Sequence, residues 1–163
     1  MPRRGAHGGS SDIVAFDFYR SRLPHVRIQG ATYFVTWRLQ KTQAELSEVE
    51  RALVAESLRH FDGRRYLLHA YVVMNDHVHV LVEPRAAFRL ESIVQSWKSF
   101  SAKRIGTLRG LAGTIWQREY FDRVVRDEDE YRQKRDYILE NPFQRWPTLH
   151  AYSWQWAIGL EPQ

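Results

Sequence analysis

Two histidines separated by one residue, His77 and His79, lie within an apolar stretch at residues 71–82 (YVVMNDHVHVLV). The apolar residues on both sides of Asn75-Asp76 predict two strands joined there by a tight antiparallel hairpin. Side chains alternate faces along a strand, so both imidazoles project from one face, about 6–7 Å apart. Two imidazoles at this spacing can share a metal ion. A half-exposed strand that happens to carry two histidines is an equally good interpretation of the pair alone.

About sixty residues later, Tyr137 and Asn141 lie four positions apart in a segment with a helical pattern, so they share a helix face. If that face meets the histidines, His77, His79 and Asn141 can hold a divalent ion that keeps open positions for phosphate oxygens. Tyr137 is then a candidate nucleophile that forms a covalent phosphotyrosine bond. Taken singly, each residue is more simply a buried, hydrogen-bonded tyrosine or a helix-terminal asparagine before proline.

Two other tyrosines compete for the role of nucleophile. Tyr131 is followed four positions later by Arg135, whose guanidinium cannot ligate a metal. Tyr120 falls in a segment that reads as a strand. The amide at position 141 therefore favours Tyr137.

The composition limits the class of protein. A chain of 163 residues is expected to form one domain, and its net charge of +5 favours an anionic partner such as nucleic acid. The absence of cysteine rules out disulfides and thiolate metal sites. No long uncharged apolar run or signal-like segment is found, so we expect a cytoplasmic, nucleoid-associated protein without a membrane span. Residues 1–20 read as a basic flexible arm, and residues 21–163 as the domain.

The elements that must position the candidate residues follow from hydrophobic periodicity. Strands are expected at 28–39, 65–74, 77–82 and 116–125, with helices at 43–60 and 90–105 and a third helix from about 127 to 141, ended by Pro142. The tail at 143–163 is expected to pack over the sheet. The order β-α-β-β-α-β plus one helix predicts an α+β, ferredoxin-like (split β-α-β) fold. Two helices would pack on one face of the antiparallel sheet, and the helix carrying the tyrosine would cross the other.

Basic and aromatic residues on the second helix and the following strand are candidates for DNA contact, although a solvated basic face explains the helix equally well. Basic side chains would meet phosphates, and aromatic rings would stack on exposed bases. Trp97, on the apolar stripe of its helix, is better interpreted as core. The tentative DNA-binding residues are Lys98, Lys103, Arg104, Trp116, Gln117, Arg118 and Arg126.

Four segments carry a resemblance to a known family: 71–82 (YVVMNDHVHVLV), 94–104 (VQSWKSFSAKR), 116–126 (WQREYFDRVVR) and 131–142 (YRQKRDYILENP). The chain resembles the single-tyrosine (Y1) HUH transposases of the IS200/IS605 type, and among them most resembles the REP-associated tyrosine transposases. His-x-His alone is a weak signal. Its combination with the WQ segment and the Tyr-x-x-x-Asn-Pro helix end is strong.

The resemblance implies a role for each matched residue. His77 and His79 fall on the pair that ligates Mg²⁺ or Mn²⁺, and Tyr137 falls on the tyrosine that becomes linked to a 5′ phosphate. Asn141 falls where the insertion-sequence enzymes carry glutamine as a third ligand. Two imidazoles suit Mn²⁺ better than Mg²⁺, which prefers oxygen.

The function that the resemblance implies is metal-dependent nicking and joining of single-stranded DNA, acting on hairpin or palindromic repeat DNA, by a monomer or a homodimer. Two alternatives stay open. One is a structured-DNA binding protein of the same fold without cleavage activity. The other is a metal-dependent hydrolase that uses water, which the sequence supports less because only Asp76 and Glu83 lie near the histidines, both at strand ends.

Overall fold

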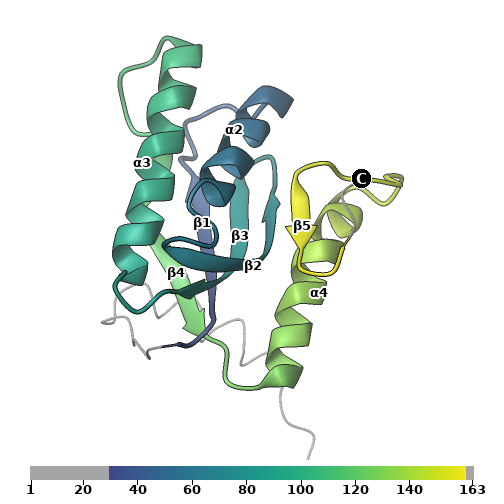
Figure 1. Ribbon diagram of the computed structural model, residues 1–163. Coiled ribbons are helices and arrows are strands. Elements are labelled where there is room, and N and C mark those ends of the chain that lie inside the picture. Colours follow the sequence, from purple (N-terminus) through teal and green to yellow (C-terminus); the bar gives the residue numbers. More distant parts are fainter. Residues whose placement is uncertain (1–29, 161–163) are drawn as a thin grey trace, which may run out of the picture.

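A five-stranded antiparallel sheet forms the centre of the computed structural model, which describes residues 30–160 (Figure 1). Its strands lie in the order β4-β1-β3-β2-β5. The strands are β1 (Tyr33–Leu39), β2 (Tyr66–Val73), β3 (His77–Pro84), β4 (Trp116–Val124) and β5 (Gln155–Ala157), and the helices are α2 (Glu48–Arg59), α3 (Leu90–Arg109) and α4 (Glu128–Arg145). The predicted α+β fold, with its β-α-β-β-α-β order and an additional helix, is confirmed. The proposed arm at 1–20 lies outside the described residues.

The sheet has a helical layer on each face, because successive residues of its strands point in opposite directions. On β1, Tyr33, Val35 and Trp37 belong to the core shared with α2 and α3. Phe34 belongs to a second core with Ile138 of α4. In Figure 1, α2 and α3 lie together on one side of the sheet, and α4 lies on the other side, next to the edge strand β5. The prediction that the third helix covers the face opposite α2 and α3 is therefore confirmed.

Helix α4 differs from the prediction at its end. Asp127 caps its start, accepting a hydrogen bond from the Glu130 N–H at 2.8 Å, but Pro142 lies inside the helix, which continues to Arg145. Proline removes one N–H donor, whereas its own carbonyl still accepts the Trp146 N–H at 2.8 Å. The prediction that Pro142 ends this helix was wrong by one turn.

The segment after α4 does more than pack over the sheet. It adds the edge strand β5, which the sequence did not predict, through the antiparallel pairs Ala70–Ala157 and Val72–Gln155. The Tyr152 hydroxyl donates to the Val73 carbonyl at 2.7 Å and so fixes the approach to this strand. Within residues 30–160, no helix has the length and apolarity that a membrane crossing requires.

A buried ion pair joins the start of α2 to the end of α3. Ser47 and Glu50 form a reciprocal capping box, in which Ser47 Oγ accepts the Glu50 N–H and the Glu50 carboxylate accepts the Ser47 N–H. Arg109 binds both oxygens of the same carboxylate, at 2.7 and 2.8 Å. This two-point bond is the main reason that the pKa of Glu50 is lowered.

We expect Glu50→Gln to lower the free energy of unfolding at pH 7 by about 2 kcal/mol, because Arg109 loses its charged partner. A carboxyl with a lowered pKa stabilises the fold above its unfolded pKa of about 4.3, and that stabilisation disappears as pH falls through the folded value. The difference in free energy of unfolding between wild type and Glu50→Gln should therefore shrink toward pH 3. Urea unfolding at both pH values, with the exposed first-turn acid changed in Glu48→Gln as control, measures this. An equal difference in free energy of unfolding at both pH values would contradict a stabilising role of the ionised Glu50 carboxylate.

Candidate active site

The β2–β3 hairpin presents both histidines to the face that α4 covers. The Met74 N–H donates to the His77 carbonyl at 2.8 Å, which closes the predicted turn at Asn75-Asp76. His77 and His79 project from the same face of β3, with ring centroids 4.7 Å apart. Both are buried, at 9% and 4% exposure. Strand β3 is therefore not the half-exposed strand that the sequence left open as an alternative.

Each imidazole is oriented by an oxygen at its Nδ1. His77 Nδ1 lies 2.7 Å from Asp76 Oδ1, and His79 Nδ1 lies 2.6 Å from Thr36 Oγ1. An Nδ1–H that donates to oxygen leaves the Nε2 lone pair available. The buried Nε2 of His79 has no hydrogen-bond partner among residues 30–160. For His79, this is the arrangement expected of a histidine whose Nε2 faces a ligand.

The surroundings keep both rings neutral. Burial lowers the pKa of His79 well below its usual value, and the charges of His77, Arg38 and Lys134 act in the same direction. Burial also lowers the pKa of His77, although the side chains of Asp76 and Asn141 oppose this. Neutral imidazole is the form that binds a metal.

Helix α4 brings the tyrosine and the asparagine to this pair, within the same chain. The Tyr137 ring lies 5.1 Å from the His79 ring, centroid to centroid, and 6.1 Å from that of Phe34. Tyr137 is 45% exposed, so its side chain reaches solvent beside the buried histidines. Asn141, one turn later, lies close enough to His77 for its side chain to act on the pKa of that histidine. The four residues singled out in the sequence thus lie together.

The donor set fits a divalent ion. In the described part of the chain, no three His, Cys, Asp or Glu residues gather into a metal-binding group. The candidate for a third protein ligand is the amide oxygen of Asn141, whose side chain lies beside His77. Two imidazoles and one amide oxygen leave several positions of an octahedral ion open.

Tyr131, the alternative candidate for the nucleophile, contacts residues outside the histidine pair. The Tyr131 hydroxyl lies 2.8 Å from His69 Nδ1, and His69 Nε2 lies 3.2 Å from the Glu83 carboxylate. His69 sits at a bulge in β2, where the register against β3 shifts. Burial raises the pKa of Tyr131, which opposes the ionisation that a nucleophile needs. These contacts give Tyr131 a role in holding α4 against the sheet.

Two of the residues suggested for DNA contact are buried. Lys98 is 8% exposed, and its ammonium donates to the carbonyls of Gln117 and Arg118 at 2.8 and 2.9 Å. Trp116 is 4% exposed, and its indole N–H donates to Ser101 Oγ at 2.9 Å. These contacts tie α3 to β4, so Lys98 and Trp116 shape the fold and do not face a ligand.

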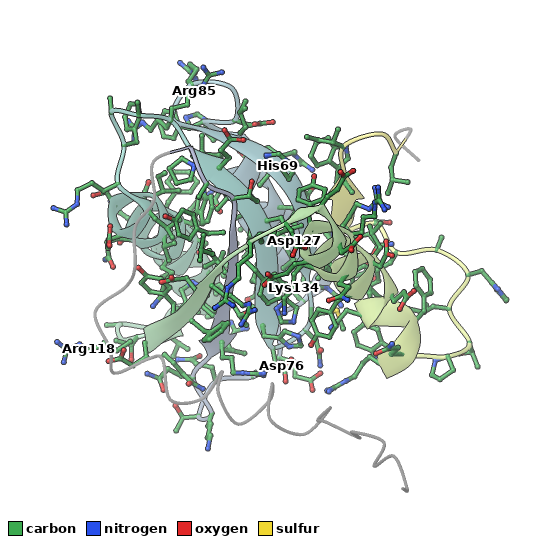
Figure 2. All side chains as sticks on the ribbon, turned by 90° about the horizontal axis from the view of Figure 1, so that it is seen from below. His69, Asp76, Arg85, Arg118, Asp127 and Lys134 are labelled. Atoms are coloured by element: carbon green, nitrogen blue, oxygen red, sulfur yellow. The ribbon has the colours of Figure 1, made fainter. Side chains whose placement is uncertain are left out.

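The remaining suggested residues lie on two different surfaces. Lys103 and Arg104 belong to α3, on the opposite face of the sheet from α4, and Arg104 pairs with Glu56 at 3.2 Å. Arg118 on β4 and Arg126 just after it are exposed, and Figure 2 shows Arg118 extending from the β4 edge. Gln117 is half-buried, and its amide donates to the Leu39 carbonyl at 3.1 Å.

Sequence reasoning missed an arginine patch formed by Arg64, Arg65 and Arg85 with Phe61 and Phe88. The Arg65 guanidinium carbon lies 3.6 Å from the Phe61 ring centroid and 5.8 Å from that of Phe88, and the Arg85 N–H donates to the Arg65 carbonyl at 3.0 Å. Arg85 directly follows β3, so the patch lies at the end of that strand opposite the His77 turn, about 25 Å away by strand rise. Figure 2 shows Arg85 and Asp76 on opposite sides of the molecule.

Comparisons with known proteins agree with this architecture. The family model described as "Transposase IS200 like" matches residues 32–141. A REP-associated tyrosine transposase of Escherichia coli (strain K12) is 23% identical over 132 residues, which cover 80% of this chain and 77% of the relative. A solved structure of a REP-associated tyrosine transposase bound to a REP hairpin superposes with a TM-score of 0.65 at 22% identity, covering 77% of this chain and 74% of that one. The matched range contains His77, His79, Tyr137 and Asn141.

Proposed function

The chain belongs to the IS200-like transposase family, and from this premise we propose that it nicks and rejoins single-stranded DNA through a 5′-phosphotyrosine bond at Tyr137. The observation that carries the proposal is the placement of an exposed phenol 5.1 Å, ring to ring, from a buried histidine whose Nε2 lacks a partner among the described residues. We further propose hairpin or palindromic repeat DNA as the substrate, since a structural neighbour was solved with a REP hairpin.

In the proposed reaction, Tyr137 Oη attacks the scissile phosphorus, the P–O3′ bond breaks, and the 5′ phosphate stays on the tyrosine. The phenolic proton leaves and the 3′ oxygen takes one up, so the overall charge is unchanged. Attack by another 3′ hydroxyl in the reverse sense rejoins the strand. A Mg²⁺ or Mn²⁺ ion held by His77, His79 and Asn141 would supply Lewis acid chemistry at the phosphate. Asp76 and Thr36 keep the two imidazoles oriented for that ion.

The test is a hairpin oligonucleotide with single-stranded flanks, labelled at either end and incubated with the protein and Mg²⁺ or Mn²⁺. We expect an SDS-resistant adduct that carries the fragment with the 5′ phosphate. Binding without cleavage under any metal would favour the structured-DNA binding alternative. Turnover without an adduct would instead favour hydrolysis by water.

For the DNA surface, we propose that the hairpin contacts the arginine patch, while Arg118 and Arg126 meet the strand that enters the active site. Lys103 and Arg104 remain candidates for phosphate contact on α3. Lys98 and Trp116 are left out because they are buried. Stacked arginine and phenylalanine side chains are suited to phosphates and exposed bases.

Changing the patch in Arg65→Gln/Arg85→Gln should weaken hairpin binding about tenfold or more and reduce the salt slope by roughly one to two, because each phosphate contact releases counterions. Fluorescence titrations at several salt concentrations, made in a Tyr137→Phe background to prevent cleavage, measure both quantities. Arg132→Gln is the matched control, because that exposed arginine pairs with Glu128 on α4. An unchanged affinity and slope would place the hairpin elsewhere.

A further inference from the structure

Arg38, near the end of β1, lies directly opposite His77 in the antiparallel register of β1 and β3. Residues that face each other across an antiparallel pair project to the same side of the sheet, with Cβ atoms about 5 Å apart. Two residues earlier on the same strand, Thr36 Oγ1 meets His79 Nδ1 on this face, at 2.6 Å. Alternation along β1 therefore places Arg38 beside the histidine pair, on the face of the sheet that meets Tyr137.

The end of β1 that carries Arg38 is accessible to solvent. Helix α4 packs mainly against β2, β3 and β5, whereas β1 and β4 lie toward the opposite edge of the sheet (Figure 1). Arg38 is exposed, and Phe121 of β4, which pairs with Thr36, is half-buried. Tyr137 also reaches solvent, at 45% exposure. A DNA strand that approaches Tyr137 over the end of β1 therefore passes the Arg38 guanidinium.

The charge of Arg38 acts on both imidazoles. It lowers the pKa of His77 and that of His79, although burial is the main cause in each case. The adjacent carboxylate, that of Asp76, lies 2.7 Å from His77 Nδ1 and orients that ring. Because a fixed cation opposes the binding of a metal ion to the same histidines, its position indicates that an anion completes the site. A guanidinium stays protonated and presents a planar fork of N–H donors that matches phosphate oxygens.

We propose that Arg38 is a further catalytic residue, which contacts a non-bridging oxygen of the scissile phosphate while Tyr137 attacks it. This proposal rests on the proposed function and assigns a residue that neither the histidine pair nor the tyrosine motif includes. As the Tyr137 Oη–P bond forms and the P–O3′ bond breaks, negative charge builds up on the non-bridging oxygens. A cation already in place stabilises that charge more strongly than it stabilises the ground state. Arg38 donates hydrogen bonds to the phosphate and transfers no proton.

The other possible role of Arg38 is that of a solvated surface charge, which is common for an exposed arginine. Arg38→Gln removes the charge and keeps a polar side chain. We expect it to slow single-turnover adduct formation at saturating hairpin DNA about 100-fold, the usual effect of removing one such donor. Arg38→Lys should restore the rate to within about tenfold of wild type, since it returns the charge without the fork. The matched control, Arg132→Gln, removes an exposed charge of α4 that pairs with Glu128 and should leave the rate within about threefold. A rate for Arg38→Gln within about threefold of wild type overturns the proposal.

The affinity for Mn²⁺ without DNA shows whether Arg38 acts only through the histidines. Arg38→Gln should leave this affinity unchanged or raise it by up to about threefold, because the arginine charge opposes binding of the ion. A role in holding His77 in position would instead lower the affinity about tenfold or more. A loss of that size would overturn the phosphate contact as the cause of slow adduct formation.

A methylphosphonate scan in EDTA keeps the result distinct from failure of the nicking proposal, because it needs neither metal nor cleavage. Each phosphate of the single-stranded flanks is replaced in turn by an uncharged methylphosphonate, and hairpin affinity is measured in a Tyr137→Phe background. At the cleaved phosphate, the replacement should weaken binding about fivefold, reflecting one charge contact near the surface. Adding Arg38→Gln should remove this penalty, as in a double-mutant cycle.

The scan and the adduct assay together separate the two proposals. If wild type forms no adduct and one position of the scan still depends on Arg38, the nicking proposal fails and the phosphate contact stands. If an adduct forms but the position that depends on Arg38 is not the cleaved phosphate, Arg38 is no catalytic residue. A scan in which no position depends on Arg38 overturns the contact itself.

Discussion

A Tyr137→Phe protein is expected to bind hairpin DNA with unchanged affinity and to form no covalent adduct. The substitution removes one oxygen and leaves the ring in contact with His79 and Phe34. Because Tyr137 is 45% exposed, the free energy of unfolding should change by less than about 0.5 kcal/mol. The rate of adduct formation should fall by about 10⁴-fold or more, since the reaction has lost its nucleophile.

The measurement is denaturing gel electrophoresis of the protein–DNA adduct, with binding followed by fluorescence anisotropy on the same oligonucleotide. Tyr131→Phe is the matched control, because its hydroxyl is bound by His69 and not by the site. It should retain adduct formation. An adduct that persists in Tyr137→Phe and disappears in Tyr131→Phe would reverse the assignment of the nucleophile.

The second large effect is expected from His79→Asn. Asparagine can still place a polar atom near Thr36, where His79 Nδ1 now lies at 2.6 Å, but it has nothing in place of Nε2. Affinity for Mn²⁺ should fall about 100-fold or more, and metal-stimulated adduct formation should become undetectable. Hairpin binding in EDTA should be unchanged, because the histidine is buried and lies outside the proposed DNA surface.

Mn²⁺ binding can be measured without DNA, by calorimetry or by the electron paramagnetic resonance signal of the free ion. His150→Asn changes an exposed histidine after α4 and serves as the control. Chelation of wild type should stop adduct formation, and added Mn²⁺ should restore it. Undiminished adduct formation in EDTA would refute metal dependence, and unchanged Mn²⁺ affinity in His79→Asn would refute this residue as a ligand.

The site could be predicted from the sequence where its residues are related by local geometry. Alternation along β3 places His77 and His79 on one face, and a spacing of four places Tyr137 and Asn141 on one helix face. The order of elements then indicates which face of the sheet α4 covers. Thr36 escaped prediction because its contact with His79 depends on the register of β1 against β3, which pairs the two residues.

Other features depend on packing that local patterns do not encode. Val49 is an apolar residue of α2, yet it is 62% exposed. Lys98 is a typical surface residue, but it is buried because two carbonyls of β4 accept its hydrogen bonds. The arginine patch joins the α2–β2 and β3–α3 connections, which only the folded topology brings together. A short edge strand such as β5 has too few residues to show a period of two.

Strand β5 also has a consequence for how copies of this chain meet. It occupies the hydrogen-bonding groups of β2 from Ala70 to Val72, and the Ile158 N–H is bonded to the His69 carbonyl. A chain truncated before residue 155 would leave that edge open to strand exchange with a neighbouring molecule. Strand β5 thus covers the free edge of β2, the strand that leads into the hairpin carrying His77 and His79.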